Sequence, residues 1–312
     1  NADNELVAQA TISFDLSPDS FQADAEKAAI SEAFGVNLED FDGDVVQIST
    51  VNGVQFLVYE VEETPVTPDA AAQAAETVQT EADKAVSMIQ AYDPNSETAE
   101  ADRRAIVDQI ETTLEALVDS PESFDAVVEV FGAVVDQISD LVRAGDVAGA
   151  KMFAMEVLAP AISALEAVRA VIDVQNIDEA LLANQVDVLI AALVAVKTAT
   201  IKMINNFDAL AEAGLGDEIM GQIEKSFDAV ANLLTVDVIT DKLNANNMEF
   251  FIAAIDALGE MTVSLIENFD KFGEFSERAM TLIENAFNTV RNILTVENVS
   301  MILDKGCVDF AI

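Results

Sequence analysis

A repeated stretch in the C-terminal half constrains the fold more than any other feature of the sequence. Residues 165–207 align without a gap on residues 227–269, and the matched positions include Asn206 and Asn268. A third copy starts at Phe287 and soon stops. Repetition at a long, fixed spacing is typical of stacked supersecondary units, none of which can bury its apolar face alone.

The repeats are about 62 residues long, and we predict them at 165–226, 227–286 and, in part, 287–303. Each repeat contains a long and a short segment with apolar residues three and four positions apart, the spacing of an amphipathic helix. The long helices are predicted at 177–213 and 239–272, and the short ones at 217–234 and 276–294. The short helices share an apolar seam, which consists of Ile219, Ile223, Phe227, Val230, Leu234 and of Met280, Ile283, Phe287, Val290, Leu294. Such seams are typical of an antiparallel helical bundle.

The middle of the chain is also predicted to be helical. Pro65 and Pro68 disfavour helix in the residues before them, so residues 64–68 are predicted to be a linker. Apolar periodicity then predicts four helices, at 69–92, 97–118, 121–145 and 147–172. The last of these contains Pro160, which favours a kink.

The N-terminal segment shows strand patterns. Residues 10–16, 45–50 and 54–62 alternate apolar and polar side chains, and the last two flank the hairpin signal Asn-Gly. A helix is predicted between the first two strands, at 17–35. The order β-α-β-β is most of a small ferredoxin-like or SEA-like domain that lacks one strand.

The predicted fold class is therefore α+β. A small β-α-β-β domain at 1–63 and the linker at 64–68 precede an elongated antiparallel helical bundle at 69–305 with internal repeats. A strand-like tail at 306–312 ends the sequence.

Charge excludes several classes of partner. The net charge is −42, from 57 acidic against 15 basic residues. Binding of nucleic acid requires a basic surface, and anionic membranes attract basic segments, so neither partner fits. High salt, a cation or a basic partner remains compatible with this charge. No apolar run is long enough to span a bilayer, since the best candidate, 186–196, contains Asp187.

The chemistry of the chain is also restricted. It has no histidine and one cysteine, which removes the usual general base, a histidine-activated nucleophile and any internal disulfide. Carboxylate pairs such as Glu111 and Glu115 lie four residues apart on polar helix faces and indicate solvation. We therefore predict that the protein is not an enzyme.

One acidic cluster suggests calcium. Asp40, Asp42 and Asp44 form the densest group of acids, but the glycine and the final residue of an EF-hand loop are misplaced. We interpret the cluster as an acidic turn that could at most hold Ca²⁺ with low affinity. No other cofactor is expected.

The C-terminal tail suggests a mode of assembly. Val308, Phe310 and Ile312 alternate as in a short strand, next to the lone Cys307. This strand could complete the N-terminal sheet, whose first strand carries Ile12 and Phe14, within one chain or between chains. Exchange between chains would give a head-to-tail filament. A tail packed on its own bundle is the alternative, and deletion of residues 306–312 distinguishes the two.

These observations favour a structural protein. We predict an acidic subunit of a filament or matrix, assembled from copies of itself or related subunits and located outside the cell or in a secretory-granule lumen. The start at Asn1 fits a mature secreted product. The alternative is a helical binding module for an apolar ligand, a pigment or calcium. Its cavity would be lined by phenylalanines, namely Phe207, Phe227, Phe250, Phe251, Phe269 and Phe287.

Overall fold

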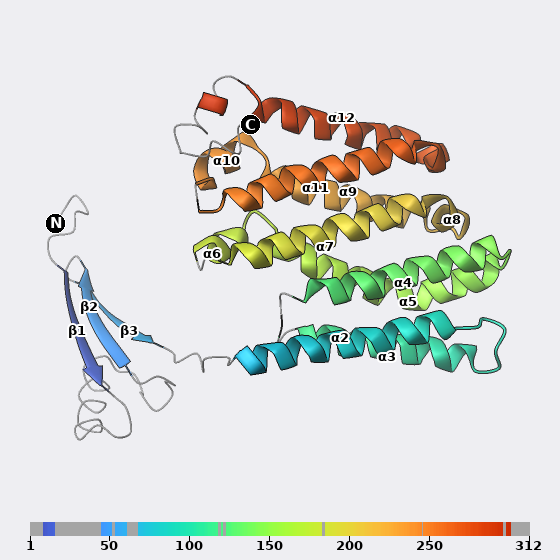
Figure 1. Ribbon diagram of the computed structural model, residues 1–312, viewed down its shortest axis with the longest axis horizontal. Coiled ribbons are helices and arrows are strands. Elements are labelled where there is room, and N and C mark those ends of the chain that lie inside the picture. Colours follow the sequence, from blue (N-terminus) through green and yellow to red (C-terminus); the bar gives the residue numbers. More distant parts are fainter. Residues whose placement is uncertain are drawn as a thin grey trace. The chain divides into compact units, whose positions relative to one another are not determined.

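The structure divides into two compact units. It is a computed structural model, and it describes residues 9–15, 45–51, 54–60, 68–117, 120, 123–182, 185–244, 246–295 and 298–300. One unit covers residues 1–70 and the other residues 71–312 (Figure 1). We call them the sheet unit and the helical unit.

Within the sheet unit, three described strands form an antiparallel sheet. They are β1 (Gln9–Asp15), β2 (Val45–Val51) and β3 (Val54–Glu60), in the order β1-β2-β3. In the pairing of β1 with β2, Ile12 lies opposite Ile48 and Phe14 opposite Val46. Both neighbours of β2 therefore run antiparallel to it.

The predicted α+β fold with a β-α-β-β domain is wrong. A split β-α-β arrangement places the crossover-linked strands parallel, with the third strand between them, whereas β1 pairs directly with β2 in antiparallel register. The described residues from Pro68 onward contain helices and their connections, with no strand among them. Alternation of side chains identifies a strand and its two faces but not its neighbour, which is why the pattern misled. The helix predicted at 17–35 lies outside the described residues.

The helical unit is a stack of helical hairpins, and the predicted helical, repeat-like structure is confirmed. The long helices are α2 (Pro68–Ala91), α3 (Ala99–Leu117), α4 (Phe124–Arg143), α5 (Val147–Val171), α7 (Val186–Asn205), α9 (Gly216–Leu233), α11 (Met248–Glu267) and α12 (Ser276–Ile293). Short helices connect them, namely α6 (Ile177–Leu182), α8 (Phe207–Glu212), α10 (Val236–Lys242) and the 3-10 helix η2 (Phe269–Phe275).

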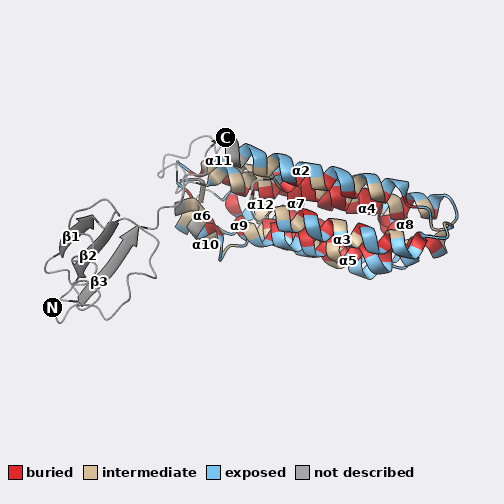
Figure 2. Ribbon diagram, turned by 90° about the horizontal axis from the view of Figure 1, so that it is seen from below, coloured by how far each residue is buried: buried red, intermediate tan, exposed pale blue. Residues whose placement is uncertain are grey.

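The stack has a regular period. Helices α4, α7 and α11 each contain 20 residues and begin at residues 124, 186 and 248, a constant spacing of 62. These three helices pack in sequence, α4 on α7 and α7 on α11. Their hairpin partners are α5, α9 and α12, and α9 packs on α12 (Figure 1). The result is two layers of helices, with the buried residues between them (Figure 2).

A glycine closes the turn of each of these hairpins. Gly145, Gly214 and Gly273 have positive φ angles of 82°, 84° and 48°, and each lies shortly before the second helix of its hairpin. A residue with a Cβ is strained in this conformation, whereas glycine is not. The turn chemistry therefore repeats together with the helices.

The predicted long helices at 177–213 and 239–272 are wrong, because each is interrupted near both ends. Asn206 and Asn268 mark the second interruption, with φ near −110°. The side-chain amide of each asparagine donates to the carbonyl four residues earlier, Lys202 O at 3.0 Å and Ser264 O at 2.8 Å. An asparagine that bonds back to the helix backbone competes with continuation of the helix.

Aromatic side chains join the ends of two neighbouring hairpins. Phe207 of α8 is fully buried and stacks on Phe272 of η2, with ring centroids 4.3 Å apart. Phe275 approaches the same ring edge-on at 5.4 Å. Since Phe207 follows α7 and the other two follow α11, this cluster fixes one repeat against the next.

Candidate functional site

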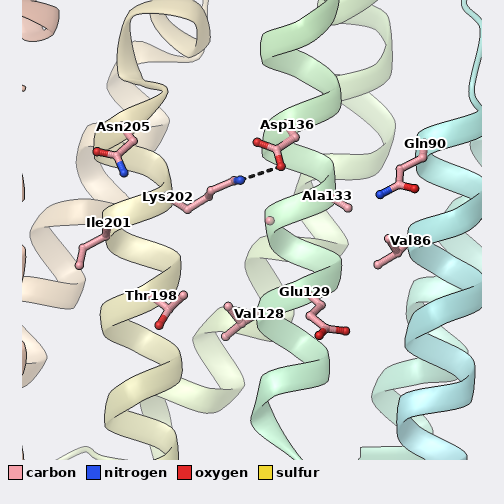
Figure 3. Close-up of a pocket in the computed structure, with 11 residues that line it drawn as sticks. Val86, Gln90, Val128, Glu129, Ala133, Asp136, Thr198, Ile201, Lys202 and Asn205 are labelled. Carbon is pink, nitrogen blue, oxygen red and sulfur yellow. Dashed lines mark hydrogen bonds and ion pairs between the residues drawn. The ribbon is translucent and has the colours of Figure 1, made fainter.

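A surface groove runs along the layer formed by α2, α4 and α7. It encloses about 410 Å³. Apolar and polar side chains alternate along it, and those labelled in Figure 3 are Val86, Gln90, Val128, Glu129, Ala133, Asp136, Thr198, Ile201, Lys202 and Asn205. A second groove of about 580 Å³ lies between α7 and α11 and shares Ile201 and Asn205 with the first. The two grooves therefore share part of their lining.

Ion pairs cross these grooves from α7 to both neighbours. Lys202 Nζ lies 2.6 Å from the Asp136 carboxylate on α4 (Figure 3). Lys197 Nζ lies 2.9 Å from the Glu260 carboxylate on α11. Partly exposed pairs of this kind contribute little to stability. They place a lysine of α7 beside a carboxylate of each neighbouring helix, whereas the packing of α7 on α4 and α11 positions the helix.

Amide groups continue the same contacts at the end of the layer. Asn205 Oδ1 accepts from Asn268 Nδ2 at 3.0 Å, and the backbone carbonyl of Asn205 accepts from Lys271 Nζ at 2.6 Å. Arg143 donates to Asn206 Oδ1 at 2.9 Å. The grooves therefore offer hydrogen-bonding groups, but their one lining lysine, Lys202, is paired with Asp136, and neither groove is lined by histidine or cysteine.

The outer face of the last hairpin is a second candidate site. On α9 and at its C-terminal cap, Met220, Phe227 and Leu234 are buried. The residues 60 positions later are Met280, Phe287 and Leu294, and they are 43%, 61% and 61% exposed. The positions that the next hairpin covers inside the stack are thus uncovered at its end.

Helix α11 shows the same change. Leu193 and Ile204 on α7 are fully buried on the side from which Lys197 reaches α11. The residues 62 positions later are Ile255, which is half-buried, and Ile266, which is 47% exposed. We call Ile255, Ile266, Met280, Phe287 and Leu294 the terminal face. Large exposed apolar surfaces commonly mark sites of protein interaction.

A buried arginine links α5 to α9, one hairpin away from this face. Arg169 on α5 is buried, and its guanidinium donates to Gln222 Oε1 on α9 at 2.9 Å. Its Nε atom has no partner among the described residues. Burial lowers the pKa of Arg169, and nearby Glu166 opposes this effect. A buried cation with incomplete hydrogen bonding stabilises a fold weakly.

We expect opposite results at the two ends of this contact. Arg169→Met should leave the free energy of unfolding unchanged or raise it by about 1 kcal/mol, because an apolar side chain replaces the buried charge. Gln222→Ala should lower it by about 2 kcal/mol, because the guanidinium loses its acceptor. Urea denaturation of both variants and of the double variant measures this. A destabilisation by Arg169→Met larger than that by Gln222→Ala would contradict the interpretation.

Two carboxyl groups near this contact have pKa values shifted in opposite directions. Partial desolvation of its largely exposed carboxyl, and then the neighbouring Glu224, raises the pKa of Asp228. A hydrogen bond from Lys225, with Nζ 2.7 Å from the carboxylate, lowers the pKa of Glu166. Ionised Asp228 therefore destabilises the folded state above its raised pKa, whereas ionised Glu166 stabilises the folded state above the unfolded value of about 4.3.

The matched amide variants should consequently differ in sign. At neutral pH we expect Asp228→Asn to raise the free energy of unfolding and Glu166→Gln to lower it, each by a few tenths of 1 kcal/mol because both groups are exposed. At acidic pH, below the pKa of each group in both states, the two differences should shrink toward zero. Urea denaturation at the two pH values tests this, and equal signs at neutral pH would refute it.

The sequence-predicted site residues lie mostly outside the described part of the chain. This holds for Asp40, Asp42, Asp44, Cys307, Val308, Phe310 and Ile312. Ile12 and Phe14 lie in β1. Within the described residues, no group of three or more acidic, histidine or cysteine side chains is placed to hold a metal. The calcium and strand-exchange hypotheses therefore stay predictions.

The phenylalanines predicted to line a ligand cavity have a different place. Phe207, Phe227, Phe250 and Phe251 are buried in the core of the helical unit, and Phe250 packs edge-on against Phe251. Phe287 is exposed on the terminal face. The sequence pattern places Phe287 in an apolar seam, but spacing alone does not show whether a neighbouring helix covers that seam.

One helix is long and apolar enough to cross a membrane by length and composition alone, namely α5. Half of its most apolar window is buried inside the structure. It packs against α3, α4 and α7. The core helix of a folded domain passes the same test, so this finding is weak evidence for a membrane span.

Comparison with known proteins supports the fold alone. No protein family and no curated protein matches the sequence. Among solved structures, the chain is similar to a circular tandem repeat protein with novel repeat topology and enhanced subunit contact surfaces. The TM-score is 0.52 at 14% sequence identity, and the match covers 78% of this chain. It covers 50% of the other protein, so the chain spans about half its length. The helical unit thus has a tandem-repeat architecture.

Proposed function

We propose that the protein is a non-enzymatic structural protein, an acidic helical-repeat subunit that assembles with copies of itself or with related subunits. The observation that carries this proposal is the terminal face. Phe287 and Leu294 are both 61% exposed, whereas Phe227 and Leu234, at the equivalent positions one hairpin earlier in the stack, are buried. A repeat stack whose last layer is apolar is suited to contact another protein.

The finer form of the proposal is a secreted subunit of a filament or matrix, outside the cell or in a secretory granule. Its support is the net charge of −42, which suits a salty environment in which charges are screened. The absence of histidine and the single cysteine also favour a structural over a catalytic role. The circular repeat protein is described by its enhanced subunit contact surfaces, and we extend to this chain only the idea that helical repeats join subunits.

Light scattering and negative-stain electron microscopy test the proposal. We expect the average mass to rise with protein concentration, and to rise further with added salt, because salt screens the repulsion between acidic chains. Microscopy shows whether the product is a filament, a sheet or a small oligomer. A protein that stays strictly monomeric at high concentration in both low and high salt would overturn the proposal.

Ligand binding is a second candidate function, favoured by the two neighbouring grooves, one along α2, α4 and α7 and the other between α7 and α11. Apolar side chains such as Val86, Val128 and Ile201 lie beside amides in the first groove. An absorbance spectrum of the native material tests for a bound pigment, and calorimetric titration tests for calcium. A colourless protein that releases no heat with calcium leaves this function without support.

A further inference from the structure

We infer that the terminal face binds the terminal face of a second copy, with the two α12 helices antiparallel about a two-fold axis near Phe287. This inference rests on the proposed function, because it names the partner and the contact of that assembly. It follows from three features of the last hairpin: the spacing of its apolar residues, the placement of its free charges and the contrast with the first hairpin.

The apolar residues on α12 have a self-complementary spacing. Met280, Phe287 and Leu294 follow one another at intervals of seven residues, so they lie on one side of the helix. A two-fold axis through the middle residue places Phe287 against Phe287, and Met280 of each copy against Leu294 of the other. An isologous interface requires this symmetry, in which residue i meets j and j meets i.

The charges beside this stripe are self-complementary as well. Glu284 and Arg291 are exposed on the same flank of α12, and neither forms an ion pair within the described residues. They lie three residues before and four residues after Phe287. In an antiparallel pair the Glu284 of one copy therefore faces the Arg291 of the other, twice by symmetry. Basic residues are rare in this chain, which has only 15. The placement of one of them, Arg291, where it meets Glu284 of the second copy therefore supports the antiparallel arrangement.

Helix α11 extends the contact. Ile255 lies near the middle of α11, as Phe287 lies near the middle of α12. The same two-fold axis therefore places α11 of one copy against α11 of the other, as it does for the two α12 helices. The contact resembles the one inside the stack, where α7 and α9 face α11 and α12. The second copy thus supplies the apolar helix faces that cover these positions in the inner repeats.

The first hairpin of the stack offers no comparable surface. Within the described residues of α2 and α3, no large apolar side chain is exposed. Its outer positions carry polar groups, among them Thr80, Asp83 and Lys84. A polar outer face is typical of the capping repeat of a helical array. Contact of the terminal face with itself therefore buries more apolar surface than contact with the opposite end of a second copy.

Sedimentation of the full chain over a range of concentrations tests the inference. We expect a monomer–dimer equilibrium, and Phe287→Glu should raise its dissociation constant about a hundredfold or more, since two buried aromatic anchors are lost in each dimer. Met155→Glu is the matched control. Met155 is 73% exposed on α5, away from the terminal face, and its replacement should change the dissociation constant by less than a factor of about three.

Charge reversal gives a second, independent test. Glu284→Arg and Arg291→Glu each place like charges opposite one another, so each should raise the dissociation constant about tenfold. The two changes shift the net charge in opposite directions, which separates the local effect from general repulsion. The double variant restores the pairing and should dimerise about as well as the parent.

The outcomes separate this inference from the proposed function. Assemblies that persist unchanged in Phe287→Glu would overturn the inference and leave the structural role intact. A full chain that is monomeric, but dimerises when residues 301–312 are deleted, would also overturn it, because that segment would then be what covers the terminal face. A chain that stays monomeric with or without that segment, in low and high salt, would overturn both. Weakening by Phe287→Glu without rescue in the double charge variant would overturn the antiparallel register.

Discussion

Replacement of Phe207 by alanine should lower the free energy of unfolding by about 3–5 kcal/mol, the range for removal of a fully buried aromatic side chain. The ring is completely enclosed, stacks on Phe272 at 4.3 Å and receives the edge of Phe275 at 5.4 Å. Its loss leaves a cavity at the junction of two repeats, where α8 packs on η2. The effect should therefore include a looser contact between the last two hairpins.

Urea denaturation followed by circular dichroism measures this change. Met155→Ala serves as the control, because a side chain that is 73% exposed should cost less than about 0.5 kcal/mol on truncation. If the Phe207 cluster couples the repeats, the variant should also show a broader transition, since the last hairpin can then open separately. A loss below about 1 kcal/mol would mean that the cluster collapses around the cavity and carries little of the stability.

Much of the helical unit could be predicted from apolar periodicity and repeat alignment. The amphipathic pattern predicted α3, α5, α9 and α12 to within a few residues, because each of these helices buries one continuous stripe. The breaks after α7 and α11 were missed, although Asn206 and Asn268 occupy matching positions of the repeat. Their amides bond to the preceding turn, an effect that apolar periodicity does not register.

The candidate sites could be predicted only in part. Lys197 and Lys202 are five residues apart on one helix, yet they pair with opposite neighbours, and only the packing of α7 between α4 and α11 shows this. The seam at Met280, Phe287 and Leu294 could be found from its spacing, but its exposure could not. Spacing defines an apolar face, whereas the presence of a covering helix is a property of the whole stack.

The start of α5 supplies the second large effect. Gly149 lies where a side chain has no room: a Cβ there would be 2.9 Å from Pro94 Cβ and 2.3 Å from Asp146 Oδ2. Asp146 is the N-cap of α5, and its carboxylate accepts from the Gly149 backbone N–H at 2.8 Å. Gly149→Val should therefore lower the free energy of unfolding by about 2–4 kcal/mol, from overpacking against Pro94 and from loss of the cap.

A double-mutant cycle separates these two causes. Asp146→Ala alone removes the cap and should cost about 1 kcal/mol. In the Gly149→Val background the same change should cost almost nothing, because the valine has already displaced the carboxylate. The control is Gly221→Ala in the interior of α9, where a Cβ meets no atom within 4 Å and the loss of glycine's flexibility should stabilise the helix by up to about 1 kcal/mol. If the losses for Asp146→Ala and Gly149→Val are additive, the cap survives the valine. The destabilisation by Gly149→Val then comes from its contact with Pro94, which lies in the turn of the first hairpin against the start of α5.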